Sequence, residues 1–173
     1  MSVYGASKVA AELAGGTVAR SAGIEHVAAR LSWAYGPGYP RPRLPRSMIL
    51  DALAGRVTFL PAGAGHRVDL TYIDDAADAF RLLIEAPVLD HDVYNVASGV
   101  SYSTVEIARV VQGLRPEWRF EIGPGLLAAD DGTPLPRKGA LEIRRLGELG
   151  YAPRVSLAEG IRREYAAIAG LRS

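Results

Sequence analysis

Two residues at the start of the chain, Tyr4 and Lys8, have the types and the spacing that proton transfer needs. On a helix, residues four apart share one face with Cβ atoms about 5–6 Å apart, so a phenol and an ammonium group can reach the same ligand. The nearby cation favours the phenolate, which makes the tyrosine a usable general acid or base near neutral pH. The same pattern occurs by chance in many helices, so the flanking sequence must decide between chemistry and coincidence.

Composition narrows the kinds of partner that the chain can have. Its 173 residues are 49% hydrophobic, enough for one compact domain. The 20 basic and 19 acidic residues form no long run of either sign, so we expect no nucleic-acid partner and no membrane partner, and a small-molecule substrate instead. We expect a cytoplasmic protein, since there is no signal-like leader and no apolar run of about 20 residues.

No thiol or metal chemistry is indicated. The sequence has no cysteine, which excludes disulfides, thiolate catalysis and cysteine-ligated zinc. The histidines His26, His66 and His91 are isolated from plausible metal-ligand partners, so we assign no metal site.

Helical and strand-like segments alternate along the chain, which is typical of an α/β fold. Apolar spacing predicts a helix over residues 4–20, a buried strand within 24–31 and a short helix from residue 46. Between them, residues 36–45 hold two glycines and four prolines and must form a shaped loop. Further along we expect strands over 68–73, 92–98 and 118–122, and helices from about residue 74, over 103–114 and over 156–169.

Local signals mark the starts of two of these helices. Asp74 and Asp75 stand where either carboxylate can cap the first by accepting free backbone N–H groups, and Phe80 and Ile84 are expected to face inward on it. In the second, Ser103 and the glutamate three residues later predict a capping box.

Five blocks of the sequence, taken in order, resemble one known family. They read YGASKVAAE, ARLSWAYGPG, TYIDDAADAF, YNVAS and LGYAPRVSLAEGI, and they span nearly the whole chain. Together they are similar to the extended short-chain dehydrogenase/reductase family, the NAD-dependent epimerases and dehydratases that act mostly on nucleotide sugars. The resemblance implies the C-terminal part of a doubly wound Rossmann-type parallel sheet plus a small mixed α/β substrate-binding lobe, with the N-terminal nucleotide-binding half missing.

The resemblance also implies a single partial domain over residues 1–173. Residues 1–35 and 67–97 would supply the Rossmann-side elements, and residues 36–66 and 98–173 mainly the substrate lobe. In such enzymes the catalytic tyrosine follows a complete glycine-rich half, whereas only three residues precede Tyr4. We therefore expect a C-terminal half, produced by a mis-called start, a truncated gene or a split gene.

In that family the tyrosine of Y-x-x-x-K is the catalytic acid/base and the lysine holds the nicotinamide ribose, and Tyr4 and Lys8 match these positions. Leu31 and Ser32 match the stretch that passes the nicotinamide, although structural packing explains them equally well. The implied cofactor is NAD, with NADP possible, because the residue that reads the ribose 2′ position would lie in the missing half.

Three further residues lie at or near the family's substrate-binding positions, but each differs from the family's pattern. Trp33 stands where relatives often have an asparagine that contacts the sugar nucleotide, and an indole cannot reproduce the contacts of an amide. Arg67 lies one residue out of register with the diphosphate-binding arginine, and surface charge explains it equally well. Arg137 resembles a later phosphate-binding arginine, but Ala140 replaces the aspartate expected three residues on.

One stretch matches the letter pattern of a dinucleotide-binding fingerprint. GPGLLA, residues 123–128, fits G-x-G-x-x-G/A after a strand-like segment. A true fingerprint opens a helix whose amino terminus meets the pyrophosphate, whereas here ADDGTPLP follows. We therefore expect no phosphate loop there.

Three functional hypotheses remain open. The chain is part of an enzyme that passes hydride to NAD, a non-catalytic remnant, or one chain of a split enzyme, because hydride transfer needs a cofactor holder of which only half is evident. We expect the isolated chain to be inactive and to associate, either as a homo-oligomer or with a separate N-terminal half. The reason is that a parallel sheet without its neighbours exposes an apolar edge, here along HVAARL and VYNVA.

Overall fold

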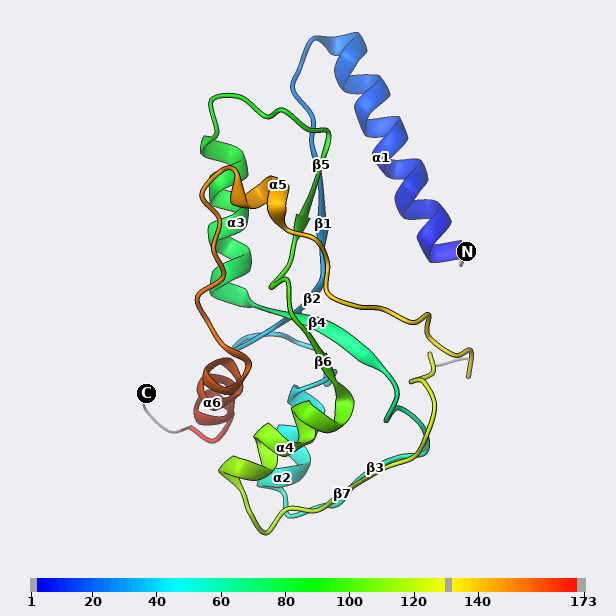
Figure 1. Ribbon diagram of the computed structural model, residues 1–173, viewed down its shortest axis with the longest axis vertical. Coiled ribbons are helices and arrows are strands. Elements are labelled where there is room, and N and C mark those ends of the chain that lie inside the picture. The colour runs from blue at the N-terminus through cyan, green and yellow to red at the C-terminus, as the bar shows by residue number, and fades with distance from the viewer. Residues whose placement is uncertain (1–2, 130–131, 171–173) are drawn as a thin grey trace.

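The computed structural model of the protein describes residues 3–129 and 132–170. Figure 1 shows an elongated molecule with helix α1 (Val3–Ala22) beside one end and a helical lobe at the other. The other helices of the described residues are α2 (Arg46–Leu53), α3 (Ile73–Glu85), α4 (Thr104–Leu114), α5 (Arg144–Gly147) and α6 (Leu157–Ile168). The strands are β1 (Ala28–Leu31), β2 (Trp33–Tyr35), β3 (Thr58–Leu60), β4 (Arg67–Tyr72), β5 (Val93–Val96), β6 (Ser101–Ser103) and β7 (Phe120–Ile122). Their alternation confirms the predicted α/β class.

Most of the strand pairs in the described residues are parallel. β1 pairs with β5, β2 with β4 and β3 with β7 in parallel register, while β6 lies antiparallel to β4. Ser32 lies between the end of β1 and the start of β2. Its backbone N–H donates to the carbonyl of Val96 in β5 at 3.0 Å. Parallel strands connected through helices are the arrangement expected of a Rossmann-type sheet.

Two hydrophobic clusters hold these elements together. In the helical lobe, α2, α4 and α6 pack with β2 and β4, and Met48, Ile107 and Ile161 are fully buried there. In the second cluster, α3 and α5 pack against β5 and bury Tyr94 and Leu146. Fully burying a large aliphatic side chain contributes about 1.5–3 kcal/mol, so each of these buried residues stabilises the fold. The division into a Rossmann side and a substrate lobe stays a prediction.

The two predicted helix starts have different outcomes. The capping box of α4 is confirmed, because the Ser103 hydroxyl accepts from the Glu106 N–H at 3.1 Å and the Glu106 carboxylate accepts from the Ser103 N–H at 2.6 Å. On α3, the inward positions of Phe80 and Ile84 were wrong: these side chains are 38% and 83% exposed. The helix covers a sheet of only two strands, which is wide enough to bury one stripe of its surface.

Burial along β1 and β5 also differs from expectation. The strand predicted within 24–31 begins only at Ala28, and Ile24 and Leu31 are 62% and 45% exposed. Conversely, β5 does not expose an apolar face, because Tyr94 is 1% and Val96 0% exposed beneath α3 and α5. Both strands have an edge without a strand partner among the described residues, but the exposed apolar side chains lie at Ile24 and Leu31 and not on β5.

The GPGLLA stretch is no phosphate loop. Residues 123–129 and 132–143 contain no helix that could receive a pyrophosphate at its amino end. The backbone explains why glycine stands at both positions. A Cβ on Gly123 would lie 2.1 Å from the Pro61 carbonyl oxygen, and Gly125 has a φ of 89°.

Candidate active site

Tyr4 and Lys8 lie on the first turns of α1 and are close to each other. The Lys8 Nζ atom is 5.5 Å from the centroid of the Tyr4 ring, within the range of a cation–π contact. Tyr4 is 72% exposed, so its phenol is open to a ligand. The helix that the sequence predicted therefore places the Lys8 amine beside the ring of an accessible tyrosine.

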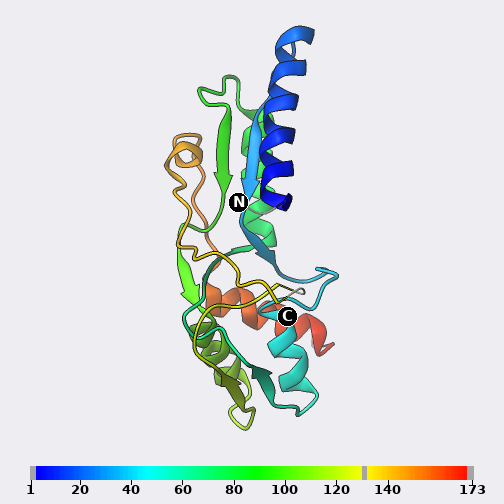
Figure 2. The same cartoon turned by 90° about the vertical axis from the view of Figure 1, so that its right-hand side faces the viewer.

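The orientation of α1 matters for what this pair can reach. The helix runs antiparallel to β1, so its amino end lies level with the carboxyl end of the strand (Figure 1 and Figure 2). In open α/β sheets, ligands bind outside the carboxyl ends of the strands. The pair is therefore at the end of the sheet where a ligand is expected.

Leu31 and Ser32 occupy that end of β1. Leu31 is exposed, whereas the Ser32 hydroxyl is 2.5 Å from the hydroxyl of the buried Thr71. The Ser32 side chain thus already has a partner within the protein. Contact of either residue with a cofactor stays a prediction.

Trp33 is part of a cluster that the sequence did not predict. Its ring centroid lies 6.2 Å from that of His66, and the Lys138 Nζ lies 6.0 Å from the Trp33 ring. His66 is fully buried, and neither ring nitrogen has a hydrogen-bond partner among the described residues. Burial and, next, the charge of Lys138 lower the pKa of His66, so its imidazole is neutral. No feature of the neighbouring sequence predicted that His66 is buried beside Trp33.

The two candidate phosphate-binding arginines, Arg67 and Arg137, have different surroundings. The Arg67 guanidinium donates to the Ser101 hydroxyl at 3.1 Å and lies 3.3 Å from the Glu106 carboxylate. Arg137 is exposed on the loop that also carries Lys138. Arg67 thus has internal partners that a phosphate would have to replace, while Arg137 belongs to the same segment as the Trp33 cluster.

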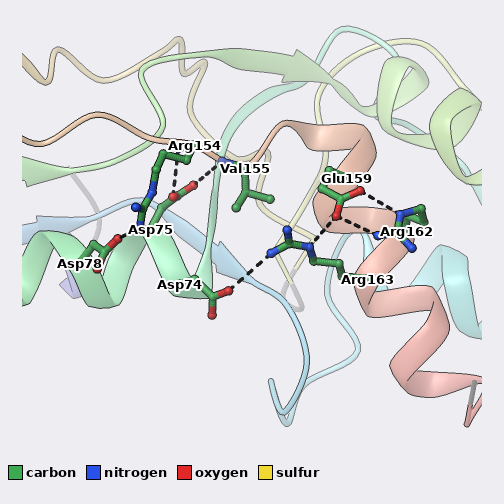
Figure 3. Close-up of polar contacts among 8 residues, drawn as sticks. All are labelled: Asp74, Asp75, Asp78, Arg154, Val155, Glu159, Arg162 and Arg163. Atoms are coloured by element: carbon green, nitrogen blue, oxygen red, sulfur yellow. Dashed lines mark hydrogen bonds and ion pairs between the residues drawn. The ribbon is translucent and has the colours of Figure 1, made fainter. Parts of the chain in front are cut away.

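Two aspartates, Asp69 and Asp75, hold backbone segments in place. Asp69 accepts from the N–H groups of Ser98 at 2.9 Å and Leu141 at 3.0 Å. The expectation that Asp74 or Asp75 caps α3 was wrong, because the N-cap is Tyr72 and no side chain caps it. Asp75 instead accepts backbone N–H groups from the segment before α6, as Figure 3 shows, so its predicted role in supporting the fold is confirmed.

Metal ligands do not gather anywhere in residues 3–129 and 132–170: no group of three or more histidine, aspartate or glutamate side chains could hold an ion there. A helix long and apolar enough to cross a membrane is likewise absent from the described part of the chain.

The residues present fit one end of a nicotinamide cofactor. The exposed phenol and amine of Tyr4 and Lys8 are groups that can bind a ribose hydroxyl and a carbonyl. Adenosine and pyrophosphate need a glycine-rich turn that opens a helix, and the described residues contain none. The described residues therefore offer groups that could contact a nicotinamide ribose and no place for adenosine and pyrophosphate.

Comparisons with known proteins agree with this architecture. The sequence pattern of the NAD dependent epimerase/dehydratase family matches residues 1–97. The chain superimposes on the UDP-glucose 4-epimerase of Thermotoga maritima, solved with UDP-glucose, with a TM-score of 0.84 and 23% identity over 98% of this chain. It superimposes on the dTDP-glucose 4,6-dehydratase of Bacillus anthracis, solved with NAD, with a TM-score of 0.83 and 20% identity over 98% of this chain.

The fold and the match over residues 1–97 define the class of protein. The chain belongs to the NAD-dependent epimerase/dehydratase family, as the motifs had indicated. Among curated proteins it is 31% identical, over 83% of its length, to the putative GDP-L-fucose synthase 2 of Oryza sativa subsp. japonica.

The chain is much shorter than these relatives. It spans 42% of the rice protein, and 54% and 53% of the two solved structures.

Proposed function

We propose that this chain carries the catalytic Tyr–Lys pair and the substrate-binding part of an NAD-dependent enzyme that epimerises, dehydrates or reduces a nucleotide sugar. The observation that carries the proposal is the pairing of the Tyr4 phenol with the Lys8 amine at the amino end of α1, level with the carboxyl end of β1. Family membership supports the reaction class.

The roles follow from the chemistry of the two groups. Tyr4 accepts the proton of a sugar hydroxyl, and Lys8 places its amine beside the Tyr4 ring. Lys8 also donates hydrogen bonds to the cofactor's ribose hydroxyls. When bound, NAD supplies the hydride acceptor.

A nucleotide sugar is the proposed substrate because two relatives carry such substrates in their names, and one was solved with UDP-glucose. Arg67, Arg137 and Lys138 supply positive charge for a diphosphate. Trp33 has no acceptor to offer, so the nucleotide sugar is held differently here from the way an asparagine would hold it.

A second candidate is one chain of a split enzyme, or a remnant that binds substrate without turnover. The observation that favours it is the incomplete cofactor site in the described residues, together with the span of about half of each solved relative. In the split enzyme, a separate polypeptide supplies the adenosine and pyrophosphate site.

Turnover of UDP-, GDP- and dTDP-sugars tests the proposal. The protein is expressed together with the nucleotide-binding half of a related enzyme, as the wild type and as the Tyr4→Phe variant. Loss of the proton-transferring oxygen is expected to lower kcat by about 10²–10⁴-fold. The matched control is Tyr165→Phe on α6, which should leave kcat unchanged. Equal rates for both variants would remove Tyr4 from the mechanism.

A further inference from the structure

The carboxylate of Asp69 on β4 joins three separate parts of the chain. Its Oδ1 atom accepts hydrogen bonds from the backbone N–H of Ser98 at 2.9 Å and from the Ser98 hydroxyl at 2.7 Å. Its Oδ2 atom accepts from the backbone N–H groups of Gly99 at 3.1 Å and Leu141 at 3.0 Å. Asp69 thereby ties β4 to the turn after β5 and to the segment that leads into α5.

This arrangement needs a carboxylate at position 69. An ionised carboxylate has about four acceptor sites and no donor, whereas an amide has one acceptor oxygen and would leave at least one N–H without a partner. Burying a charged group is unfavourable unless hydrogen bonds compensate it, and here uncharged groups of the two segments supply them. Asp69 is 5% exposed, so water does not readily take its place as the acceptor. The same side chain therefore fixes both segments.

One of these segments is a strap of residues 135–143, which runs from the loop after β7 to α5 (Figure 1, yellow to orange). At its amino end, the N–H of Leu135 donates to the carbonyl of Leu127 at 2.7 Å. At its carboxyl end, next to the bond with Asp69, the side-chain amide of Asn95 donates to the carbonyl of Glu142 at 2.8 Å. The backbone between these two anchored ends makes no hydrogen bond within the described residues. The strap is therefore held at its ends alone.

The middle of the strap carries two adjacent cations without a counter-charge. Arg137 and Lys138 are exposed, and neither forms a hydrogen bond or an ion pair with another residue of 3–129 or 132–170. The Lys138 Nζ lies 6.0 Å from the ring of Trp33, which begins β2 just after the carboxyl end of β1. Ligands bind at that end of an open α/β sheet. These two charges are thus available to an anion at the expected place.

We propose that Asp69 is a positioning residue for nucleotide-sugar binding, which fixes the strap so that Arg137 and Lys138 present their charges to the substrate's diphosphate. This inference rests on the proposed function. Asp69 does not touch the substrate, because its four acceptor sites are used within the protein. It acts by holding the strap before binding. Without the bond to Leu141, binding would have to order the strap, and the lost conformational entropy would weaken affinity.

Titration calorimetry of UDP, GDP and dTDP into the 173-residue chain tests this role. Asp69→Ala should lower the affinity for the diphosphate that binds tightest by about tenfold. The matched control is Asp75→Ala, which also removes a buried carboxylate that accepts two backbone N–H groups, but from the segment before α6. It should leave the affinity unchanged. Hydrogen exchange at the Leu141 amide should be at least about fivefold faster in Asp69→Ala, and circular dichroism verifies the fold of both variants.

A double-mutant cycle separates positioning from a purely structural role. Lys138→Met should lower the diphosphate affinity about fivefold in the wild type and by less than twofold in Asp69→Ala, because the cation is no longer held in place there. Arg109→Met, on the exposed face of α4, removes a cation elsewhere and should change neither affinity. If Asp69→Ala does not fold, an ester in place of the Leu141 amide removes the same hydrogen bond and keeps the buried carboxylate. The ester should reproduce the loss of affinity.

Three results would overturn the inference. They are no binding of the three diphosphates to the wild type, an affinity of Asp69→Ala that falls no further than that of Asp75→Ala, and a Lys138→Met effect of equal size in both backgrounds. The titrations need neither NAD nor Tyr4. If they succeed while Tyr4→Phe keeps full turnover, the role of Asp69 stands and the proposed catalysis fails. If Tyr4→Phe loses turnover while the titrations show no coupling, the role of Asp69 alone fails.

Discussion

The Asp75 carboxylate accepts a hydrogen bond of 3.0 Å from the backbone N–H of Arg154, which ties the first turn of α3 to the segment leading into α6 (Figure 3). Its other oxygen accepts from the N–H of Val155 at 3.1 Å. Asp75 is only 3% exposed, so water does not readily take the place of its carboxylate as the acceptor for these two N–H groups. The adjacent Asp74 makes only a 3.7 Å ion pair with Arg163 at the surface.

Asp75→Ala should lower the free energy of unfolding by roughly 2 kcal/mol, because it leaves two part-buried backbone donors without their acceptor. Asp74→Ala is the matched control and should cost no more than about 1 kcal/mol, since an exposed ion pair and a charge in the first helical turn are weak. Urea unfolding measures both. Equal costs for the two variants would contradict the role assigned to Asp75.

Glu164 predicts a pH dependence of stability. It is fully buried on α6, its Oε2 has no hydrogen-bond partner within the described residues, and its Oε1 lies 3.4 Å from Arg46. Burial raises the pKa of Glu164, and the opposing effect of Arg46 is smaller. The folded state therefore favours the protonated form, whose stabilisation is present below the unfolded value of about 4.5 and is lost as pH rises through the raised pKa.

Glu164→Gln should remove this loss, since the amide stays neutral at every pH. Melting temperatures between pH 4 and 8 should therefore fall less steeply with rising pH in the variant than in the wild type. Glu121→Gln, on the exposed side of β7, should leave the profile unchanged. Parallel profiles for wild type and Glu164→Gln would refute the prediction.

The capping box of α4 offers a test of local stability. Ser103→Ala removes the acceptor for the Glu106 N–H and should destabilise the protein by about 1 kcal/mol. Ser103→Thr keeps a hydroxyl and should recover most of that loss. Thermal unfolding followed by circular dichroism distinguishes the two variants. Equal melting temperatures for the alanine and threonine variants would show that the cap does not stabilise the protein.

Lys8→Met should affect both cofactor binding and rate in the protein assembled with its nucleotide-binding part. Loss of the amine removes hydrogen bonds to the ribose and the charge beside the Tyr4 phenol, so the KM for NAD should rise and kcat should fall by tenfold or more. Arg109→Met, on the exposed face of α4, removes a cation elsewhere and should change neither. A change confined to the KM for the sugar would contradict the role of Lys8.

Several features were predictable because they depend on neighbours in the chain. The Tyr4–Lys8 contact follows from helical spacing, and the α4 start follows from a serine and a glutamate three residues apart. Both are decided within one or two turns of backbone. The longer helices, α1, α3, α4 and α6, were predicted close to their observed bounds for the same reason, whereas the short elements β2, β3, β6 and α5 were not predicted.

Features that depend on distant elements were not predictable. Phe80 and Ile84 fit an apolar helical face, yet they are exposed because β1 and β5 form a sheet too narrow to cover them. His66 gave no local sign that it is buried beside Trp33, from which it is 33 residues away in the sequence.

The sequence by itself determined the family, the alternation of helices and strands and the pairing of phenol with amine, since motif order and short-range periodicity carry that information. Only the tertiary structure decided which strands pair, which side chains such as Asp75 are buried and where Arg67 finds its partners. These depend on contacts between residues tens of positions apart, such as Asp75 with Val155. Such contacts form only when burial of the two hydrophobic clusters offsets the entropy of ordering the chain between them.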